Sequence, residues 1–315
     1  MSHLPLVSIA AINYNNSKTV IETLESIRNQ TYPNIELIVV DDCSTDNDVE
    51  LINDWLKSYT GNYKFIQHEK NLGISATYNS GLKNATGKYF STVDTDDAIL
   101  PEKIEIQVKI LEASDEKTAA VYSNAYLMDV NSALIEGLFI QCHRKFSEIP
   151  SGNIYKTLLQ GNYIPVMSVL IKKAIFNDIG LYDEDLYDND FDMWLRIAKK
   201  YDIVFSDYIS SKYRIRPGSL SFVITQNEWM YTDAKIFLKH IGAPLPVQRL
   251  KNLALEAYCT NDMDTMPLVN ELADKENNNY FKTAYLLWKY RVPVAHGEKV
   301  LAKLDNNDSV WYRRK

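Results

Sequence analysis

Three aspartates within four residues, Asp94, Asp96 and Asp97, follow an apolar run and precede a proline. Carboxylates this close repel one another, and a shared divalent cation is one way to cancel the repulsion. The alternative is an exposed turn that caps the following helix, which is the commoner use of such a cluster. The cluster alone therefore leaves both a metal site and a turn open.

A second acidic cluster contains Asp41, Asp42 and Asp46 and also follows an apolar run. Asp190 is a third candidate, because apolar side chains at helical spacing through 190–200 predict a helix that begins at this acid. The N-terminus of a helix stabilises a negative charge. Capping is the alternative role for Asp190, and turn formation is the alternative for Asp46.

Four apolar runs, residues 6–12, 35–40, 63–67 and 88–93, alternate with segments of helical periodicity. This order predicts a parallel sheet with helices on both faces, because its crossovers are right-handed. Ligands bind such sheets beyond the carboxyl ends of the strands. Both acidic clusters follow strands, so we expect them at that edge, which favours a metal or nucleotide site over two unrelated turns. Further along, residues 126–140 predict a hairpin or a loose strand pair.

The loop after the first predicted strand, residues 13–16, reads Asn-Tyr-Asn-Asn. A dinucleotide fold or a P-loop would have glycines there, because backbone N–H groups must approach the phosphates closely. A diphosphate bound without a glycine loop needs a cation, and paired aspartates are hard oxygen ligands suited to Mg²⁺ or Mn²⁺. The sequence thus predicts a divalent metal as cofactor.

Taken together, these stretches resemble the inverting family 2 glycosyltransferases, which have the GT-A fold. The resemblance implies an α/β fold with a Rossmann-like mixed sheet flanked by helices, and a nucleotide-diphosphate sugar as donor. It implies that Tyr14 and Asp42 line the nucleotide base pocket. It also implies that Asp94, Asp96 and Asp97 form the metal-binding D-x-D, with Asp94 also facing the donor. The matching stretches are residues 7–15, 40–46, 71–81, 85–89 and 94–97.

The same resemblance aligns Asp190 with the acid that serves as general base. The chain departs from the family pattern at Asn189, where Glu is usual, and at Tyr78, where Arg is frequent. In an inverting transfer, a metal at the D-x-D stabilises the departing diphosphate, and a carboxylate on the far side accepts the proton of the attacking hydroxyl. Such a transfer requires no covalent intermediate and no nucleophilic Ser or Cys.

Residues 213–221 resemble the family's loop over the donor phosphates, so the resemblance implies that Arg214 or Arg216 binds a phosphate oxygen. Arginine suits this role because its guanidinium forms paired hydrogen bonds with phosphate. A pair of solvated arginines before a turn is the alternative.

The chain of 315 residues carries a net charge of -7. This balance argues against a nucleic-acid surface, which needs clustered Lys and Arg. The three cysteines are far apart without C-x-x-C spacing, which predicts a cytoplasmic location and neither a disulfide framework nor a zinc site. No apolar run reaches the roughly 18 residues of a membrane span, so we expect at most peripheral contact with the inner face of a membrane. The basic, aromatic end at 311–315 can touch anionic lipid, or it is a solvated terminus.

We predict a catalytic domain at residues 1–221, with a nucleotide-sugar half at about 1–100 and an acceptor half at about 101–221. Residues 222–315 predict a helical region. These helices can pack on the catalytic domain, form a homodimer or present the acceptor.

The resulting prediction is a metal-dependent inverting glycosyltransferase in cell-surface polysaccharide synthesis. It would move a sugar from a nucleotide-diphosphate donor, UDP-linked in our interpretation, to a hydroxyl of a saccharide or lipid-linked saccharide. A nucleotidyltransferase is one alternative, although the Gly-rich first loop of that class is missing. A non-catalytic sugar-binding or scaffold module of the same fold is the other, and it would explain the departures at Asn189 and Tyr78.

Overall fold

The computed structural model describes residues 4–219 and 223–305. Two segments with predictions attached, the end of the arginine loop at 220–221 and the terminus at 311–315, lie outside the described residues.

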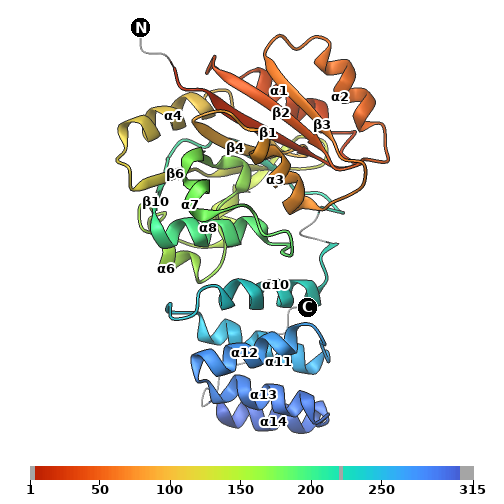
Figure 1. Cartoon of the computed structure of the whole chain (residues 1–315), viewed down its shortest axis with the longest axis vertical. Coiled ribbons are helices and arrows are strands. Elements are labelled where there is room, and N and C mark those ends of the chain that lie inside the picture. The colour runs from red at the N-terminus through yellow and green to blue at the C-terminus, as the bar shows by residue number, and fades with distance from the viewer. Residues whose placement is uncertain (1–3, 220–222, 306–315) are drawn as a thin grey trace. The chain divides into compact units, whose positions relative to one another are not determined.

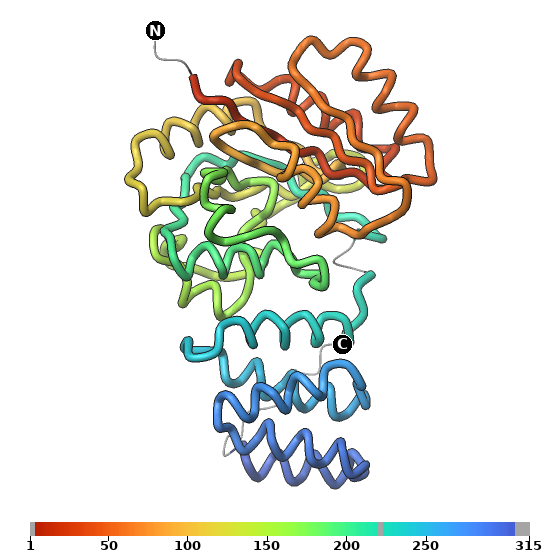
Figure 2. Tube along the Cα trace, viewed as in Figure 1, coloured from red at the N-terminus to blue at the C-terminus, as the bar shows by residue number. Residues whose placement is uncertain are grey.

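The chain forms two compact units. The first contains Met1–Asp185 and Asn189–Phe222, and the second contains Leu186–Asp188 and Val223–Lys315. Figures 1 and 2 show a sheet with flanking helices in the first unit and helices alone in the second. All candidate site residues belong to the first unit.

A seven-stranded sheet forms the centre of the first unit. From one edge to the other its strands are β10 (Asp202–Phe205), β6 (Thr118–Tyr122), β9 (Leu170–Lys172), β4 (Tyr89–Asp94), β1 (Val7–Asn13), β2 (Ile35–Asp41) and β3 (Asn62–Gln67). Neighbours are parallel except at β9, which pairs antiparallel with β4 and β6. The strands β1, β2 and β4 are buried almost throughout, as their continuous apolar runs predict. The predicted mixed α/β sheet is confirmed.

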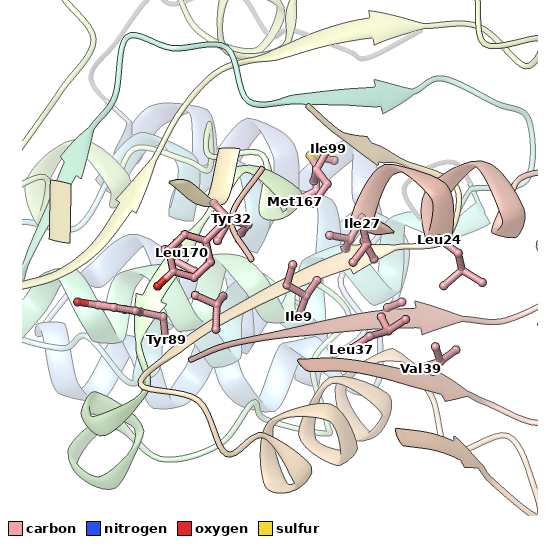
Figure 3. Packing of buried hydrophobic residues seen from close by; sticks show 14 of the residues in the cluster. Ile9, Leu24, Ile27, Tyr32, Leu37, Val39, Tyr89, Ile99, Met167 and Leu170 are labelled. Carbon is pink, nitrogen blue, oxygen red and sulfur yellow. The ribbon is translucent and has the colours of Figure 1, made fainter. Parts of the chain in front are cut away.

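Helices cover both faces of this sheet, and the alternation of side chains along β1 decides what each face contacts. Ile9 belongs to the main hydrophobic cluster, which also contains Leu24 and Leu37 (Figure 3). Ala10 faces the other way, where a Cβ added at Gly81 would lie 2.8 Å from the Ala10 Cβ. Glycine at this position therefore allows the covering helix to pack closely. The cluster receives residues from α1 (Val20–Arg28), α2 (Asp48–Leu56) and α4 (Lys103–Ala113), and Gly81 lies on α3 (Ile74–Asn84).

A smaller four-stranded sheet joins distant segments of the chain next to residues 94–97. Its order is β5 (Ala98–Ile99), β11 (Ser211–Arg214), β7 (Ala125–Met128) and β8 (Leu134–Leu138). The strands β7 and β8 are antiparallel, which confirms the hairpin predicted within 126–140. The strand β11 runs between β5 and β7, so it lies next to the segment that follows the D-x-D.

Short helices complete the first unit, and one longer helix carries Asp190. That helix, α8 (Asn189–Lys200), confirms the helix predicted at 190–200. The shorter helices are α5 (Phe139–His143), α6 (Tyr155–Leu158) and α7 (Phe176–Ile179), with 3-10 turns at Val166–Ser168 and Lys173–Ile175.

The second unit is helical, and Figure 2 shows its helices stacked on one another. A capping box begins the first helix, because the Thr225 side chain accepts from the Glu228 N–H while the Glu228 carboxylate accepts from Thr225. Among the described residues, no helix is both long and apolar enough to cross a bilayer. The helices are α10 (Gln226–Leu238), α11 (Val247–Cys259), α12 (Thr265–Glu276), α13 (Asn279–Lys289) and α14 (Val294–Leu304).

Candidate active site

The two acidic clusters meet at one edge of the sheet. In the strand register, Asn13 is opposite Asp41, and Ile12 is opposite both Val40 and Asp94. The carboxyl ends of β2 and β4 therefore flank the end of β1. The topology that the apolar runs predict is what brings these acids together.

Side-chain hydrogen bonds lock the three strand ends to one another. Asn13 Nδ2 donates to Asp41 Oδ1 at 2.7 Å and to Asp48 Oδ2 at 3.0 Å. Asn13 Oδ1 accepts from Thr95 Oγ1 at 2.6 Å. Burial raises the pKa of the Asp48 carboxyl. Sequence reasoning missed Asn13 and Asp48 as site residues, because an Asn after a strand and an acid in a first helical turn are ordinary features.

Asp42 is almost fully buried and holds the start of α3. Its Oδ1 accepts from the Leu72 N–H at 2.8 Å, and its Oδ2 accepts from the Gly73 N–H at 2.9 Å. The ring of His68 lies beside it, with Nδ1 at 2.7 Å from Asp42 Oδ1. Tyr14 is in the neighbouring loop and is 45% exposed, so its ring is available to a ligand.

Asp94 is the acid at the end of β4. It accepts a hydrogen bond of 2.7 Å from the Tyr78 hydroxyl. Burial and the negative charge of Asp96 raise the Asp94 pKa to about 7, while the Tyr78 hydrogen bond opposes that rise. The charge of Asp190 also raises this pKa, so the structure brings Asp190 and Asp94 within electrostatic reach of each other.

Asp96 and Asp97 lie in different surroundings. Asp96 Oδ2 is paired with Arg216 Nε at 2.8 Å, and Arg216 Nη2 donates to Asn16 Oδ1 at 2.7 Å. Asp97 is buried, and its Oδ1 accepts from the backbone N–H of Arg214 at 2.8 Å. Burial and the Asp96 charge raise the Asp97 pKa well above its usual value. Asp97 therefore holds β11, while the Asp96 carboxylate stays beside Asp94.

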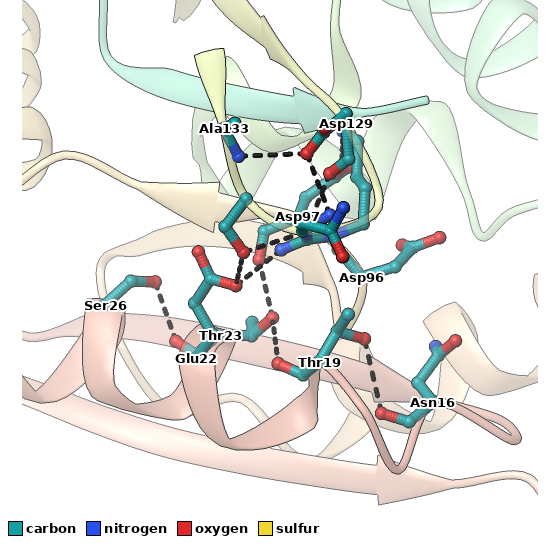
Figure 4. Close-up of polar contacts among 12 residues, drawn as sticks. Asn16, Thr19, Glu22, Thr23, Ser26, Asp96, Asp97, Asp129 and Ala133 are labelled. Carbon is teal, nitrogen blue, oxygen red and sulfur yellow. Dashed lines mark hydrogen bonds and ion pairs between the residues drawn. The ribbon is translucent and has the colours of Figure 1, made fainter. Parts of the chain in front are cut away.

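The two arginines of the predicted loop also differ. The Arg214 side chain is 1% exposed, whereas the Arg216 side chain is 26% exposed. All three guanidinium nitrogens of Arg214 donate to protein acceptors, some of which Figure 4 shows. Arg216 therefore has the better access to a ligand.

Asp190 lies in the first turn of α8 and accepts from Asn162 Nδ2 at 3.2 Å. Its charge also raises the pKa of the buried Tyr182, whose hydroxyl has no hydrogen-bond partner among the described residues. Asn79 holds the backbone of Tyr182 in place, since its side-chain amide donates to the Tyr182 carbonyl and accepts from the Tyr182 N–H. Beside Asp190, the buried Asn189 Nδ2 likewise has no partner in the described part of the chain.

The donor set of Asp94 and Asp96 fits a divalent cation. Both groups are hard oxygen ligands, and Mg²⁺ commonly binds one or two carboxylates together with substrate phosphates. Asp96 already has a cationic partner in Arg216, as expected of a carboxylate beside a second acid. No cluster of three or more His, Cys, Asp or Glu side chains suited to a metal is present in residues 4–219 and 223–305. The two carboxylates would then be the protein ligands, and water or substrate oxygens would fill the remaining positions.

This arrangement can bind a diphosphate on one side and accept a proton on the other. The model of the family described as "Glycosyl transferase family 2" matches residues 8–174, and the chain belongs to that family. This result confirms the predicted family.

Several curated relatives are similar over about two thirds of the chain. An uncharacterized glycosyltransferase of Rickettsia prowazekii, RP339, is 34% identical over 219 residues, which cover 67% of this chain and 64% of that protein. The Escherichia coli UDP-Glc:alpha-D-GlcNAc-diphosphoundecaprenol beta-1,3-glucosyltransferase WfgD is 29% identical over 221 residues, 69% of this chain and 79% of WfgD. This chain spans between 30% and 65% of the length of several Rickettsia relatives that it matches.

Solved structures show the same fold at low sequence identity. Staphylococcus aureus TarS 1-349 in complex with UDP-GlcNAc has a TM-score of 0.63 and 20% identity, over 98% of this chain and 93% of that one. The mannosyltransferase PcManGT from Pyrobaculum calidifontis, in complex with GDP-Man and Mn²⁺, has a TM-score of 0.59 and 16% identity, over 97% and 89%. The predicted GT-A fold is thereby confirmed.

Proposed function

We propose that this chain transfers a sugar, with inversion, from a nucleotide-diphosphate sugar to a hydroxyl of a saccharide or lipid-linked saccharide. The observation that carries the proposal is that Asp94 lies at the carboxyl end of β4 beside the end of β1, while Asp190, in the first turn of α8, is close enough for its charge to act on Asp94. An acid on one side and a diphosphate-binding pair on the other is the arrangement that a direct displacement requires.

In this proposal the donor binds over the ends of β1, β2 and β4. Tyr14 offers an exposed ring to the nucleotide base, and Asp42 lies at the end of the neighbouring strand. Asp94 and Asp96 would hold a divalent metal, Mn²⁺ or Mg²⁺. When bound there, the metal supplies positive charge that stabilises the departing diphosphate. Arg216 leaves its ion pair with Asp96 to bind a phosphate oxygen.

We assign different roles to the two remaining residues of the predicted donor site. Asp97 supports β11 through the Arg214 N–H, rather than binding a metal. Arg214 is fully used by protein acceptors, so we do not assign it to a phosphate.

Asp190 is the proposed general base. Asn162 holds one of its oxygens, and the first turn of α8 stabilises its ionised form. The unpartnered hydroxyl of Tyr182 lies within electrostatic reach of both Asp190 and Asp94. An acceptor hydroxyl bound beside Asp190 would give up its proton as it attacks the anomeric carbon.

The relatives guide the choice of donor and acceptor to test. WfgD is named for UDP-Glc and for a diphosphoundecaprenol-linked acceptor, and the TarS structure contains UDP-GlcNAc. We therefore propose a UDP-sugar donor and a lipid-linked or polymeric saccharide acceptor for this chain, with the reaction on the cytoplasmic side of the membrane. PcManGT contains GDP-Man, so GDP-sugars belong in the same test.

We keep homodimer formation through the C-terminal helices as a separate proposal. It is supported by apolar side chains on α13 and α14, because Leu286, Val300 and Leu304 are each more than 40% exposed. A molar mass of one chain by light scattering at micromolar concentration would contradict it.

Thermal shift with a panel of UDP- and GDP-sugars, with and without Mn²⁺, tests the donor proposal. We expect a rise in melting temperature that needs both a nucleotide sugar and the metal, followed by release of the nucleoside diphosphate when the acceptor is added. Release of pyrophosphate from a nucleoside triphosphate and a sugar phosphate would instead indicate a nucleotidyltransferase. Binding without turnover under any metal would indicate a non-catalytic module.

A further inference from the structure

Arg214 is a buried arginine at the centre of a hydrogen-bond network beside the D-x-D. Its Nε donates to the Asp96 carbonyl at 2.7 Å, and its Nη2 donates to Glu22 Oε2 at 2.6 Å. Its Nη1 donates to the Asp129 carbonyl and to Ser132 Oγ, both at 3.0 Å. Every nitrogen of the guanidinium is therefore in use, and binding a donor phosphate would break contacts that are already formed.

The network joins three parts of the chain that are far apart in sequence (Figure 4). Glu22 comes from α1, Asp96 from the loop after β4, and Ser132 from the turn between β7 and β8. The Ser132 hydroxyl also donates to Glu22 Oε2 at 2.6 Å. Glu22 thus receives two hydrogen bonds, which orient its carboxylate toward the guanidinium.

The loop that contains Asp96 and Asp97 is held by both β11 and α1. The Arg214 N–H donates to Asp97 Oδ1 at 2.8 Å, and the Asp97 carbonyl accepts from Thr23 Oγ1 at 2.5 Å. Two residues beyond Arg214, Arg216 contacts the Asp96 carboxylate. One segment of chain therefore holds Asp96 twice, by its carbonyl and by its carboxylate.

We propose that Arg214 and Glu22 are positioning residues that set the place of the Asp96 carboxylate for the metal and the donor diphosphate. This inference rests on the proposed function, because it assumes that Asp96 is a metal ligand. Arg214 acts through the Asp96 carbonyl and contacts neither donor nor acceptor.

The chemistry of the network explains why arginine is used here. A buried charge is costly unless it is paired and fully hydrogen-bonded. If Arg214 only filled space in the core, an apolar side chain of similar volume would give a more stable protein. The planar guanidinium directs several donors at fixed angles, which allows it to hold two carbonyls and a carboxylate together. A lysine at the same position has one nitrogen and cannot reach all these acceptors.

The test compares Arg214→Lys and Glu22→Gln with the wild-type chain. Glu22→Gln keeps an oxygen for Arg214 and removes the charge, and the Glu22 side chain is 35% exposed, so this variant is expected to fold. The matched control is Arg249→Lys, which weakens a paired contact with Asp233 in the helical unit. Each protein is titrated with MnCl₂ alone, and free Mn²⁺ is measured by electron paramagnetic resonance. Melting temperature and donor affinity are measured in parallel.

We expect Arg214→Lys to bind Mn²⁺ about tenfold more weakly or worse, as changes to outer-sphere partners of metal ligands do. Glu22→Gln should give a smaller loss in the same direction, and Arg249→Lys should bind Mn²⁺ as the wild type does. A lower melting temperature with unchanged Mn²⁺ affinity in both site variants would overturn the proposal, because it would reveal a purely structural ion pair. If Arg214→Lys does not fold, the Glu22→Gln titration decides by the same criterion. Failure of the wild-type chain to bind Mn²⁺ or a nucleotide sugar would instead overturn the proposed function.

Discussion

Replacing Lys103 by Met should remove a loss of stability that the first unit suffers as the pH falls toward 7. Lys103 is fully buried on α4, where its Nζ donates to Ser91 Oγ at 2.9 Å and to the Val169 carbonyl at 3.3 Å. No carboxylate pairs with it among the described residues, and burial lowers its pKa from 10.5 to about 7. Met has a similar length and carries no charge. In the variant, Ser91 Oγ still donates to the Val169 carbonyl at 2.7 Å, so the hydroxyl keeps its partner.

The size of the effect follows from the two pKa values of Lys103. Between pH 7 and 10.5 the unfolded chain keeps a proton on this side chain that the folded chain releases. The free energy of unfolding therefore rises with pH across this window. From pH 7 to pH 9 the contribution of Lys103 should increase by about 2 kcal/mol, because one pKa unit corresponds to about 1.4 kcal/mol.

Urea unfolding at pH 7 and pH 9 measures this difference. The wild type should gain about 2 kcal/mol more than Lys103→Met over that interval, and the variant should be the more stable protein at pH 7. Lys109→Met is the matched control, since Lys109 lies on the same helix, is 70% exposed and pairs with Glu105. Equal pH dependence in the wild type and Lys103→Met would refute the reasoning, because Lys103 would then keep its ordinary pKa in the folded chain.

Four further predictions concern the proposed site. Asp190→Asn should lower kcat by roughly 10²- to 10⁴-fold with unchanged donor affinity, as measured by steady-state kinetics and calorimetry; normal turnover would remove Asp190 from the mechanism. Asp96→Ala should abolish metal-dependent donor binding in the thermal shift assay, and retained binding would contradict its role as a ligand. Arg216→Ala should strengthen Mn²⁺ binding in the absence of donor, because Asp96 loses its ion-pair partner. The same variant should raise the KM for the donor. No change in either value would count against the proposal that Arg216 moves from Asp96 to a donor phosphate. Tyr78→Phe removes a hydrogen bond that lowers the Asp94 pKa, so that pKa should rise above about 7. The acidic limb of donor binding against pH should then move to higher pH, and an unmoved limb would contradict this assignment.

The main sheet was predictable because its central strands are buried on both faces and read as unbroken apolar runs. β9 has three residues, and β5 has two. Segments this short carry no periodicity, and their pairing partners are far away in sequence. The smaller sheet around β11 was therefore invisible to pattern reasoning, apart from the β7–β8 hairpin.

The location of the candidate site could be predicted from the sequence, but the contacts of its individual side chains could not. Topology alone brings the ends of β2 and β4 together, so Asp42 and Asp94 could be expected at one edge. Asp97 binds the backbone of β11, whereas the Asp96 carboxylate pairs with Arg216, and this difference depends on which side chain faces β11. Likewise, the acceptors that surround the buried Arg214 come from three distant segments, and the spacing of residues reveals none of them.

The interlocked strand ends also bear on how the family can diverge. Asn13 is bound to both Asp41 and Asp48 and accepts from Thr95, so a change at one of these positions leaves a buried polar group without its partner. Substitutions within such a network are non-additive, and a second change is needed to restore what the first removes. Loops that contact only their own neighbours can change one residue at a time. We therefore expect Asn13, Asp41, Asp48 and Thr95 to be replaced together, rather than singly, in other members of the family.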